Sequence, residues 1–402
     1  MKIALYGHGG SQNHGNEAIA RGLHELFPDA DYQLFTFHNS IPVDKKFNLD
    51  EIAEIKYFTR TFPWNKTEKF KKFIHRNDKN YEYKKFFSPF LHNIEKDRIY
   101  FLEAVDQYCE PGEHRKWYAF LNKKIRAKGA VSVMLGCSIT EDVINEPEVL
   151  KDLKNYSVII ARESLTYNLL KKAGLENTYL APCPAFAMPA EKCVLPECFD
   201  NKDVIGFNAE FLQQGNEIFS DILLENYKNA IEYVLNSTGS NILLIPHVNW
   251  SYEMSGSRTL EKLYALYKDT NRVFMLGEKS APQVKYILSK LKAFVALRTH
   301  AQIPAIASKV PTIIAGYKHK SIGISKDIYG ENSPLLAHVQ SLDNTFVIKE
   351  KLEYLLNNYE ECKTFLENKI PSYVENLSVI QKLITDSGVL SGDANRNKEI
   401  RR

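Results

Sequence analysis

Apolar and polar positions near the N-terminus predict a strand, a glycine-rich loop and a helix. Residues 2–6 (KIALY) form a short apolar run, and a loop with several glycines follows it. In residues 15–27 the apolar side chains recur at helical spacing. The chain therefore begins with a strand–loop–helix unit of the kind found in α/β proteins.

The same alternation of apolar runs and helical patterns continues through two stretches of the chain. Strands separated by helical patterns are typical of parallel βαβ units. The proline-rich residues 179–198 lack any such period and separate the two stretches. We therefore predict two Rossmann-like doubly wound α/β domains, at residues 1–195 and 200–375, with the end of a helix and a flexible tail at 376–402. The further strand candidates are residues 31–37, 130–139, 156–164, 203–210, 241–250, 272–277, 293–300 and 310–317.

Composition is that of a soluble globular protein. Of the 402 residues, 44% are hydrophobic and 25% charged, and the net charge of +3 is far below that of a dedicated nucleic-acid-binding protein. The N-terminus lacks the long apolar core of a signal peptide, and no apolar run is long enough to span a membrane, so we expect a cytoplasmic protein. The six cysteines are scattered without a CxxC pair. We accordingly predict free thiols and no metal site.

Residues 60–87 interrupt the regular pattern with a basic and aromatic segment. The ordinary interpretation is a solvated helical face. A second is peripheral contact with an anionic bilayer that carries a lipid-linked glycan, and a third is a sugar-binding surface built from aromatic rings. Nucleic acid is the least favoured partner, because lysines and aromatics without a motif are weak signals.

The glycine-rich loop resembles neither of the common nucleotide-binding loops. A dinucleotide fingerprint needs glycine at position 12, where Gln12 stands, and the Gly-Lys-Ser or Gly-Lys-Thr ending of a phosphate loop is absent. What remains is a turn into a helix whose N-terminal amides suit an anion or sugar hydroxyls. Gly15, Asn16 and Glu17 are thus candidates for substrate contact. The alternative is that Asn16 only caps the helix and that Glu17 is favoured there by the helix dipole.

Basic side chains follow several predicted strands at their carboxyl ends, where open α/β sheets bind ligands. Arg162 ends one strand in the first domain, with Ser164 two residues later. In the second domain Arg298 ends another strand, and an extended backbone would direct His300 to the same side. The remaining candidates are His247, Lys318 and Lys320. Each residue type also has a plain alternative: the arginines could be salt-bridged, the histidines structural and the lysines solvated.

Five motifs are spread along the chain: GNEAI (15–19), RES (162–164), PCPAF (182–186), IPH (245–247) and RTHAQIPAIASKVPTIIAGYKHK (298–320). Together they resemble the polysaccharide pyruvyl transferase family, over residues 2–320. The resemblance implies two domains that face a cleft in a glycosyltransferase-B-like arrangement. It also implies transfer of the enolpyruvyl group of phosphoenolpyruvate to a glycan as a cyclic ketal. Cys183 departs from the family, which commonly has aspartate there.

Roles for the candidates follow from the chemistry that the resemblance implies. Arg162 and Arg298 would clamp the phosphate and carboxylate of phosphoenolpyruvate, since guanidinium suits both groups. His300 would bind the donor and act as general acid, while His247 would accept a hydroxyl proton or bind phosphate. Lys318 and Lys320 would neutralise charge on the phosphate or acceptor.

We therefore expect phosphoenolpyruvate as co-substrate and no other cofactor. The expected acceptor is a sugar of a surface polysaccharide or of its lipid-linked precursor, bound on the side of the first domain. Two alternatives stay open. One is a nucleotide-sugar glycosyltransferase of the same architecture, because fold alone does not fix function. The other is a non-enzymatic glycan-binding subunit, an alternative that Cys183 keeps open.

Overall fold

The chain forms two compact α/β units that are not simple halves of the sequence. The computed structural model describes residues 1–60, 75, 78, 80–103, 108, 113–209, 217–248, 257–316 and 319–385. Unit 1 comprises Met1–Ser11, Leu26–Cys183 and the chain from Leu377 onwards, and unit 2 comprises Gln12–Glu25 and Pro184–Asn376. These units differ from the expected ranges, because the first helix lies in unit 2 and the last described helix in unit 1. Of the helix end and tail predicted at 376–402, the residues after Thr385 lie outside the described part of the chain.

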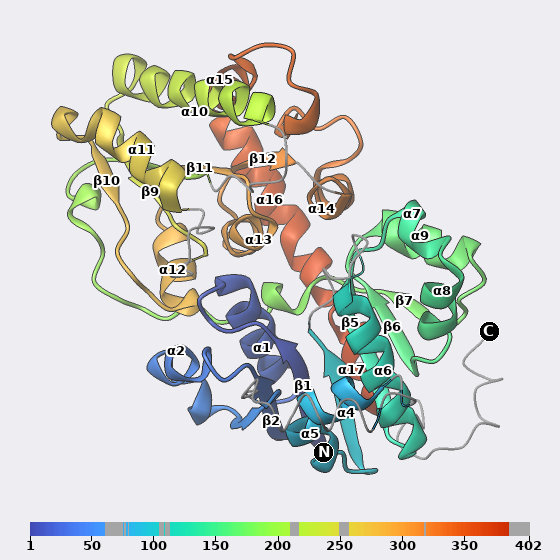
Figure 1. Cartoon of the computed structure of the whole chain (residues 1–402). Coiled ribbons are helices and arrows are strands. Elements are labelled where there is room, and N and C mark those ends of the chain that lie inside the picture. The colour runs from blue at the N-terminus through green and yellow to red at the C-terminus, as the bar shows by residue number, and fades with distance from the viewer. Residues whose placement is uncertain are drawn as a thin grey trace. The chain divides into compact units, whose positions relative to one another are not determined.

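Unit 1 is built on a seven-stranded sheet in which all neighbouring strands are parallel, in the order β3-β2-β1-β4-β5-β6-β7. The order reverses between β1 and β4, which are adjacent at its centre. The strands are β1 (Lys2–His8), β2 (Asp31–Thr36), β3 (Glu54–Tyr57), β4 (Arg98–Leu102), β5 (Val131–Cys137), β6 (Val158–Ala161) and β7 (Thr178–Leu180). Figure 1 shows the last three side by side.

Helices connect these strands, as the pattern of the sequence predicts. The helix that the sequence places before Gly174 is α9 (Ser164–Lys172). The others in unit 1 are α2 (Ile41–Lys46), α4 (Tyr81–Phe86), α5 (Ser88–His92), α6 (Glu113–Ala127), α7 (Glu141–Ile144), α8 (Pro147–Leu153) and α17 (Ser378–Thr385).

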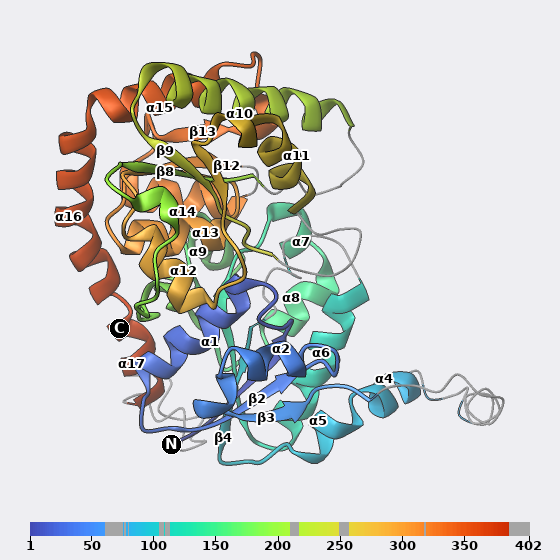
Figure 2. The ribbon, with the colours of Figure 1, turned by 90° about the vertical axis from the view of Figure 1, so that its left-hand side faces the viewer.

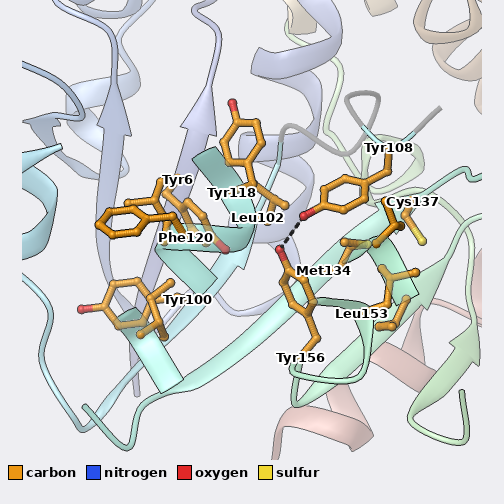
Figure 3. Close-up of a cluster of buried hydrophobic side chains, with 14 of the residues drawn as sticks. Tyr6, Tyr100, Leu102, Tyr108, Tyr118, Phe120, Met134, Cys137, Leu153 and Tyr156 are labelled. Carbon is orange, nitrogen blue, oxygen red and sulfur yellow. Dashed lines mark hydrogen bonds between the residues drawn. The ribbon is translucent and has the colours of Figure 1, made fainter. Parts of the chain in front are cut away.

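An aromatic core fills one side of the unit 1 sheet (Figure 3). A polar chain runs through it: the Tyr108 hydroxyl donates to Asp152 Oδ2 over 2.6 Å and lies 3.3 Å from the Tyr156 hydroxyl. Asn122 Nδ2 donates to Asp152 Oδ1 over 2.9 Å. Burial raises the pKa of Asp152, and the two hydrogen bonds offset only part of that rise. These bonds let polar groups sit in an apolar core, where an unsatisfied group would cost about 1–3 kcal/mol.

Unit 2 has a six-stranded sheet, again with all neighbours parallel, in the order β10-β9-β8-β11-β12-β13. The order reverses between β8 and β11. The strands are β8 (Val204–Asn208), β9 (Asn241–Leu244), β10 (Val273–Met275), β11 (Ala293–Ala296), β12 (Thr312–Gly316) and β13 (Leu336–His338).

The helices of unit 2 include the first of the chain, α1 (His14–Leu26), predicted at residues 15–27. Figure 2 shows the long helix α16 (Tyr359–Glu375) in red along the side of this unit, where it packs on α13, α14 and α15. The others are α10 (Glu217–Ser237), α11 (Ser257–Tyr267), α12 (Ala281–Leu288), α13 (Thr299–Ala307), α14 (His319–Tyr329) and α15 (Val347–Asn357).

The prediction of two doubly wound parallel α/β domains is confirmed by the two sheets. The pattern analysis missed β3, β4, β7 and β13, which have only three to five residues each. A run of this length gives only a weak periodic signal, and β4 also follows the irregular basic segment. Missing β4 hid the centre of the unit 1 sheet.

Candidate functional site

The switch point of the unit 2 sheet places Asn208 beside the loop that carries Arg298. Asn208 ends β8 and is fully buried. Its Oδ1 accepts a hydrogen bond from the Arg298 amide over 3.0 Å, and its Nδ2 donates to the carbonyl of Ile245 over 3.0 Å. One side chain therefore fixes the loops after β9 and β11. The sequence analysis did not select Asn208, although a polar residue that ends an apolar strand was available as a signal.

Arg298 and His300 lie at the start of α13 rather than on an extended strand. Arg298 is the N-cap residue, with φ −75° and ψ 129°, and the helix begins at Thr299. The amides of Ala301 and Gln302 donate to the Arg298 carbonyl over 2.9 and 3.0 Å. The expectation that His300 extends the strand is thus wrong, because these hydrogen bonds close the first helical turn. Both Arg298 and His300 remain partly exposed.

The first turn of α1 packs against the loop after β9. The His14 amide donates to the His247 carbonyl over 3.2 Å, and Asn13 forms an antiparallel bridge with Val248. Asn13 Oδ1 accepts the Gly15 amide over 3.0 Å. The Asn13 side chain therefore accepts an amide of the first turn, the capping role that the sequence analysis gave to Asn16 only as its alternative.

Three imidazole rings gather where these elements meet. The rings of His14 and His247 are edge to face, with centroids 5.2 Å apart and an interplanar angle of 87°. The two residues are only 3% and 2% exposed. His300 lies against the backbone of Gly15, where an added Cβ would be 2.3 Å from its Nδ1. The structure thus brings together Gly15, His247 and His300, and adds His14, which no pattern in the sequence singled out.

Electrostatics keep the two buried rings neutral near pH 7. Burial lowers the pKa of His247 well below its ordinary value, and the charges of His14, His300 and Arg298 lower it further. Burial likewise lowers the pKa of His14 to about 4, although the backbone carbonyl of Lys279, as acceptor, and the charge of Glu278 act to raise it. A neutral imidazole is able to accept a proton, so these rings suit a base better than an acid.

Glu17 lies inside the protein. It is fully buried, Oε2 accepts the Ala281 amide at the start of α12 over 2.8 Å, and Oε1 accepts from Arg21 Nε over 2.9 Å. These contacts give Glu17 a structural role in joining α1 to α12. Asn16 on the same helix is partly exposed.

Lys320 is the candidate lysine whose place in the structure is described. Lys320 lies in the first turn of α14 and is buried. Next to it, the hydroxyls of Ser321 and Thr299 are 2.7 Å apart and link α14 to α13. Lys318 lies outside the described residues.

Arg162 and Ser164 belong to unit 1. Arg162 follows β6, is only 1% exposed, and donates from Nε to Ser138 Oγ over 2.9 Å. Ser164 begins α9, whose N-cap Glu163 accepts the Thr166 amide over 2.9 Å. The predicted clamp between Arg162 and Arg298 requires both units and stays a prediction.

A buried ion cluster at the switch point of the unit 1 sheet was missed entirely. His8, at the end of β1, donates from Nδ1 to Glu103 Oε2 over 2.9 Å and from Nε2 to Asp44 Oδ1 over 3.3 Å. Ser11 donates to the same Asp44 oxygen through its amide and hydroxyl, over 2.8 and 2.7 Å. The sequence analysis placed His8 in the glycine-rich loop after the predicted strand 2–6, and a histidine directly after that strand was the available signal.

Charge pairing outweighs burial at His8. Burial alone lowers the pKa of His8, but the neighbouring Glu103 and Asp44 carboxylates raise it to about 10. Burial raises the pKa of Glu103, and the charge of His8 offsets part of that effect. The cluster therefore holds a histidinium between two carboxylates, which fixes the end of β1 and the loop to Ser11.

Within the described part of the chain, no cluster of three or more His, Cys, Asp or Glu side chains is arranged to hold a metal ion. Among the same residues, no helix has the length and apolar character needed to cross a membrane.

Comparison with known proteins gives one family and one fold. The model of the polysaccharide pyruvyl transferase family matches residues 13–319. No curated protein matches the chain at a significant level.

Three solved structures resemble the chain in fold at low sequence identity. A putative UDP-N-acetylglucosamine 2-epimerase from Listeria monocytogenes has a TM-score of 0.62 at 11% identity and covers 98% of each chain. The UDP-GlcNAc 2-epimerase from Neisseria meningitidis, bound to UDP-GlcNAc, has a TM-score of 0.57 at 12% identity, over 96% of this chain and 100% of its own. The trehalose 6-phosphate synthase from Burkholderia multivorans has a TM-score of 0.55 at 11% identity, over 100% of this chain and 98% of its own. These likenesses confirm the glycosyltransferase-B-like fold class.

Proposed function

We propose that this chain, which belongs to the polysaccharide pyruvyl transferase family, transfers the enolpyruvyl group of phosphoenolpyruvate to a sugar and releases phosphate. The acceptor would be a residue of a surface polysaccharide or of its lipid-linked precursor, such as a galactose or an acylated hexosamine. The observation that carries the proposal is the group formed by Arg298, His300 and His247 at the carboxyl end of the unit 2 sheet. It combines an arginine whose backbone amide is held by Asn208 with two imidazoles, side chains that serve as acids and bases in catalysis.

The reaction needs a proton donor and proton acceptors. An acid adds a proton to the methylene carbon of the enol and leaves an oxocarbenium-like centre at C2. One sugar hydroxyl adds there and loses its proton, and phosphate then leaves with the C2–O electron pair. A second hydroxyl adds with loss of its proton and closes the cyclic ketal. Phosphoenolpyruvate is the co-substrate, and this scheme uses no metal or redox cofactor.

Residue roles follow from exposure and charge. His300 is partly exposed and next to the Arg298 cap, which suits a donor ligand and general acid. The lowered pKa of His247 favours the base over the acid, so we assign it the hydroxyl proton. Arg298 would neutralise the phosphate or carboxylate of the donor. Arg162 and Ser164 in unit 1 would supply further contacts, as would Lys318, Lys320, Gly15 and Asn16.

A phosphate-release assay tests this function. Purified protein with phosphoenolpyruvate and a panel of galactosides and acylated hexosamines should release one phosphate per ketal formed. Arg298→Ala should abolish release, whereas Lys262→Ala, which changes an exposed lysine of α11 in the same unit, should retain it. Absence of release across the panel would count against the proposal.

The second candidate is a nucleotide-sugar glycosyltransferase, favoured by the fold of the structural neighbours. Ligands that bind the native state raise the melting temperature. Phosphoenolpyruvate should therefore raise it, and uridine or guanosine diphosphate sugars should not. The opposite result, together with sugar transfer to an acceptor, would replace the pyruvyl transferase proposal with this one.

Cys183 bears on a third candidate, a glycan-binding subunit without activity. Its side chain is 1% exposed, in unit 1. We propose that the cysteine is compatible with catalysis. Cys183→Asp, which restores the residue common in the family, should then leave the turnover of the folded protein within a fewfold of the original. A large gain in turnover would show instead that Cys183 impairs catalysis.

We also propose a cytoplasmic location with peripheral contact at the inner face of the membrane. The basic and aromatic residues 60–87 support this contact, although most of that segment lies outside the described residues. Sedimentation with anionic phospholipid vesicles should deplete the protein from solution at low salt. If equal amounts of protein stay in the supernatant with neutral and with anionic vesicles, the proposed membrane contact is contradicted.

A further inference from the structure

The buried ion cluster of unit 1 has two carboxylate oxygens for which the described part of the chain provides no hydrogen-bond donor. We propose that Asp44 and Glu103 bind hydroxyl groups of the acceptor sugar through these oxygens, which makes this edge of the unit 1 sheet the acceptor subsite. The inference rests on the proposed function, from which it takes a sugar as the ligand. It goes beyond that function by assigning the sugar to two residues that lie outside all five family motifs.

Every donor that Asp44 meets is directed at the same oxygen. The Ser11 amide, the Ser11 hydroxyl and His8 Nε2 donate to Oδ1 over 2.8, 2.7 and 3.3 Å. Glu103 accepts His8 Nδ1 at Oε2 over 2.9 Å. Among the described residues, Asp44 Oδ2 and Glu103 Oε1 have no partner, although Asp44 is fully buried and Glu103 is only 4% exposed. An ionised carboxylate accepts at both oxygens, so each group keeps acceptor capacity for a ligand.

Other buried carboxylates of the protein have donors on both oxygens. Asp152 in unit 1 accepts the Tyr108 hydroxyl at Oδ2 over 2.6 Å and Asn122 Nδ2 at Oδ1 over 2.9 Å. Glu17 in unit 2 likewise has a donor on each oxygen. A buried polar group without a partner is unfavourable and therefore rare. The two open oxygens of the cluster thus mark a place for hydrogen-bond donors that come from a ligand.

Strand order and register put the cluster at the edge of the sheet where ligands bind. His8 ends β1 and Glu103 follows β4, at the reversal of strand order that open α/β sheets use for ligands. Directly after His8, the partly exposed Gly9 brings the chain to the surface. His8 is paired with Thr36 on β2, and Thr36 with Tyr57 on β3. Two strand spacings, roughly 10 Å, therefore separate His8 from Tyr57.

An exposed aromatic pair lies on the same face of the sheet as His8. Residues paired across neighbouring strands share a face, which relates His8 to Tyr57 through Thr36. The rings of Tyr57 and His38 are stacked, with centroids 5.4 Å apart and an interplanar angle of 19°. Tyr57 is 51% exposed, and His38 is exposed as well. A tyrosine ring offers an apolar face to the C–H side of a sugar ring. Carboxylates and an aromatic face at this separation suit two linked sugars.

The charge of the cluster favours a neutral, hydroxyl-rich ligand. Burial lowers the pKa of His8, but the Glu103 and Asp44 carboxylates raise it to about 10, so the ring is charged near pH 7. One histidinium between two carboxylates leaves a net negative charge. Carboxylates accept hydroxyl hydrogens in charge-assisted hydrogen bonds, whereas they repel the phosphate and carboxylate of phosphoenolpyruvate. The acceptor, and not the donor, therefore fits this cluster.

Sugar binding in the absence of phosphoenolpyruvate measures this subsite alone. Calorimetry with the full chain would use N-acetyllactosamine, which joins a galactose to an acylated hexosamine, beside the single galactosides and acylated hexosamines of the assay panel. Asp44→Asn and Glu103→Gln should each weaken the affinity for the tightest-binding sugar by about tenfold or more, because a neutral amide replaces a charged acceptor. Asp152→Asn changes a buried carboxylate of the same unit and is the matched control. It should lower the melting temperature and leave the affinity for the sugar unchanged.

Tyr57→Ala tests the aromatic part with a variant that leaves the core intact. Because the side chain is exposed, the melting temperature should stay nearly constant. The affinity for N-acetyllactosamine should fall by about threefold to tenfold. Tyr354→Ala, which removes an exposed tyrosine of unit 2, should leave that affinity unchanged. If both carboxylate variants fail to fold, the comparison of these two tyrosine variants decides the question.

The outcomes separate this inference from the proposed function. If none of the sugars binds, or if the folded variants of Asp44, Glu103 and Tyr57 bind them as the unmodified protein does, the subsite is overturned. Phosphate release with an acceptor would in that case leave the function standing. Sugar binding that is lost in the variants, without any reaction of phosphoenolpyruvate, would support the subsite and overturn the function.

Discussion

The imidazole of His300 packs directly on the backbone of Gly15. A Cβ added to Gly15 would lie 2.3 Å from Nδ1 and 2.5 Å from Cγ of His300, distances that real Cβ atoms do not tolerate. The contact brings the first turns of α1 and α13 together. Glycine at this position therefore sets where the His300 ring lies.

Gly15→Ala should displace His300 and impair the donor site. The whole His300 side chain must move, because its Cβ and Cγ atoms, and not only the far end of the ring, occupy the space of the added Cβ. We expect kcat/KM for phosphoenolpyruvate to fall by about tenfold or more, which corresponds to about 1.4 kcal/mol. Steady-state kinetics check this. Gly239→Ala, in the same unit and with no atom within 4 Å of the added Cβ, is the control, and equal kinetics in the two variants would contradict the prediction.

Gly22→Ala should destabilise the protein. A Cβ at Gly22 would lie 1.9 Å from the carbonyl oxygen of Pro184 and 3.2 Å from the Ala185 amide. Backbone atoms cannot swing aside as a side chain can, so the helix must shift. Overpacking of this kind costs about 1–3 kcal/mol. Denaturant unfolding measures the loss, and a variant as stable as Gly239→Ala would show that α1 moves at no cost.

Asn208→Ala should weaken the donor site by freeing the loops after β9 and β11. The substitution removes the acceptor for the Arg298 amide and the donor to the Ile245 carbonyl. Each buried group left unsatisfied costs about 1–3 kcal/mol. We expect a lower melting temperature and, in the protein that remains folded, a KM for phosphoenolpyruvate raised by about tenfold.

A matched variant separates position from stability. Asn229→Ala removes a side-chain hydrogen bond of 2.7 Å to the Thr345 carbonyl in the same unit. It should lower stability and leave the KM unchanged. If both asparagine variants raise the KM equally, the effect at Asn208 is one of general destabilisation.

His8→Gln should remove a pH-dependent part of the stability. The folded pKa of His8 is about 10, raised from 6.5, so the stabilising charge is fully present below about pH 6.5 and is lost as pH rises towards 10. Breaking such a buried ion cluster costs about 3–5 kcal/mol. The difference in unfolding free energy between His8→Gln and the original should therefore be largest near pH 6 and should shrink steadily towards pH 10. Urea unfolding at several pH values measures it, and a difference that stays constant with pH would contradict the raised pKa.

The sequence by itself determined the elements and the fold class. Apolar periodicity records which side chains are buried, so residues 2–6, 15–27 and 203–210 were identified as β1, α1 and β8 to within a few residues. Strand ends also directed attention to Arg298 and His247. The prediction of the elements and the choice of these two residues both rest on local patterns, because a strand end or a helix start can be recognised from a few neighbouring residues.

The tertiary structure alone decided which side chains meet. His14 joins His247, and His8 joins Glu103, only because of the order of the strands and the packing of α1, and neither contact leaves a local pattern. The placement of His300 on a helix, rather than on an extended strand, was likewise fixed by hydrogen bonds that close the first turn of α13. Periodicity reports burial one segment at a time, whereas a site is assembled by the pairing of distant segments.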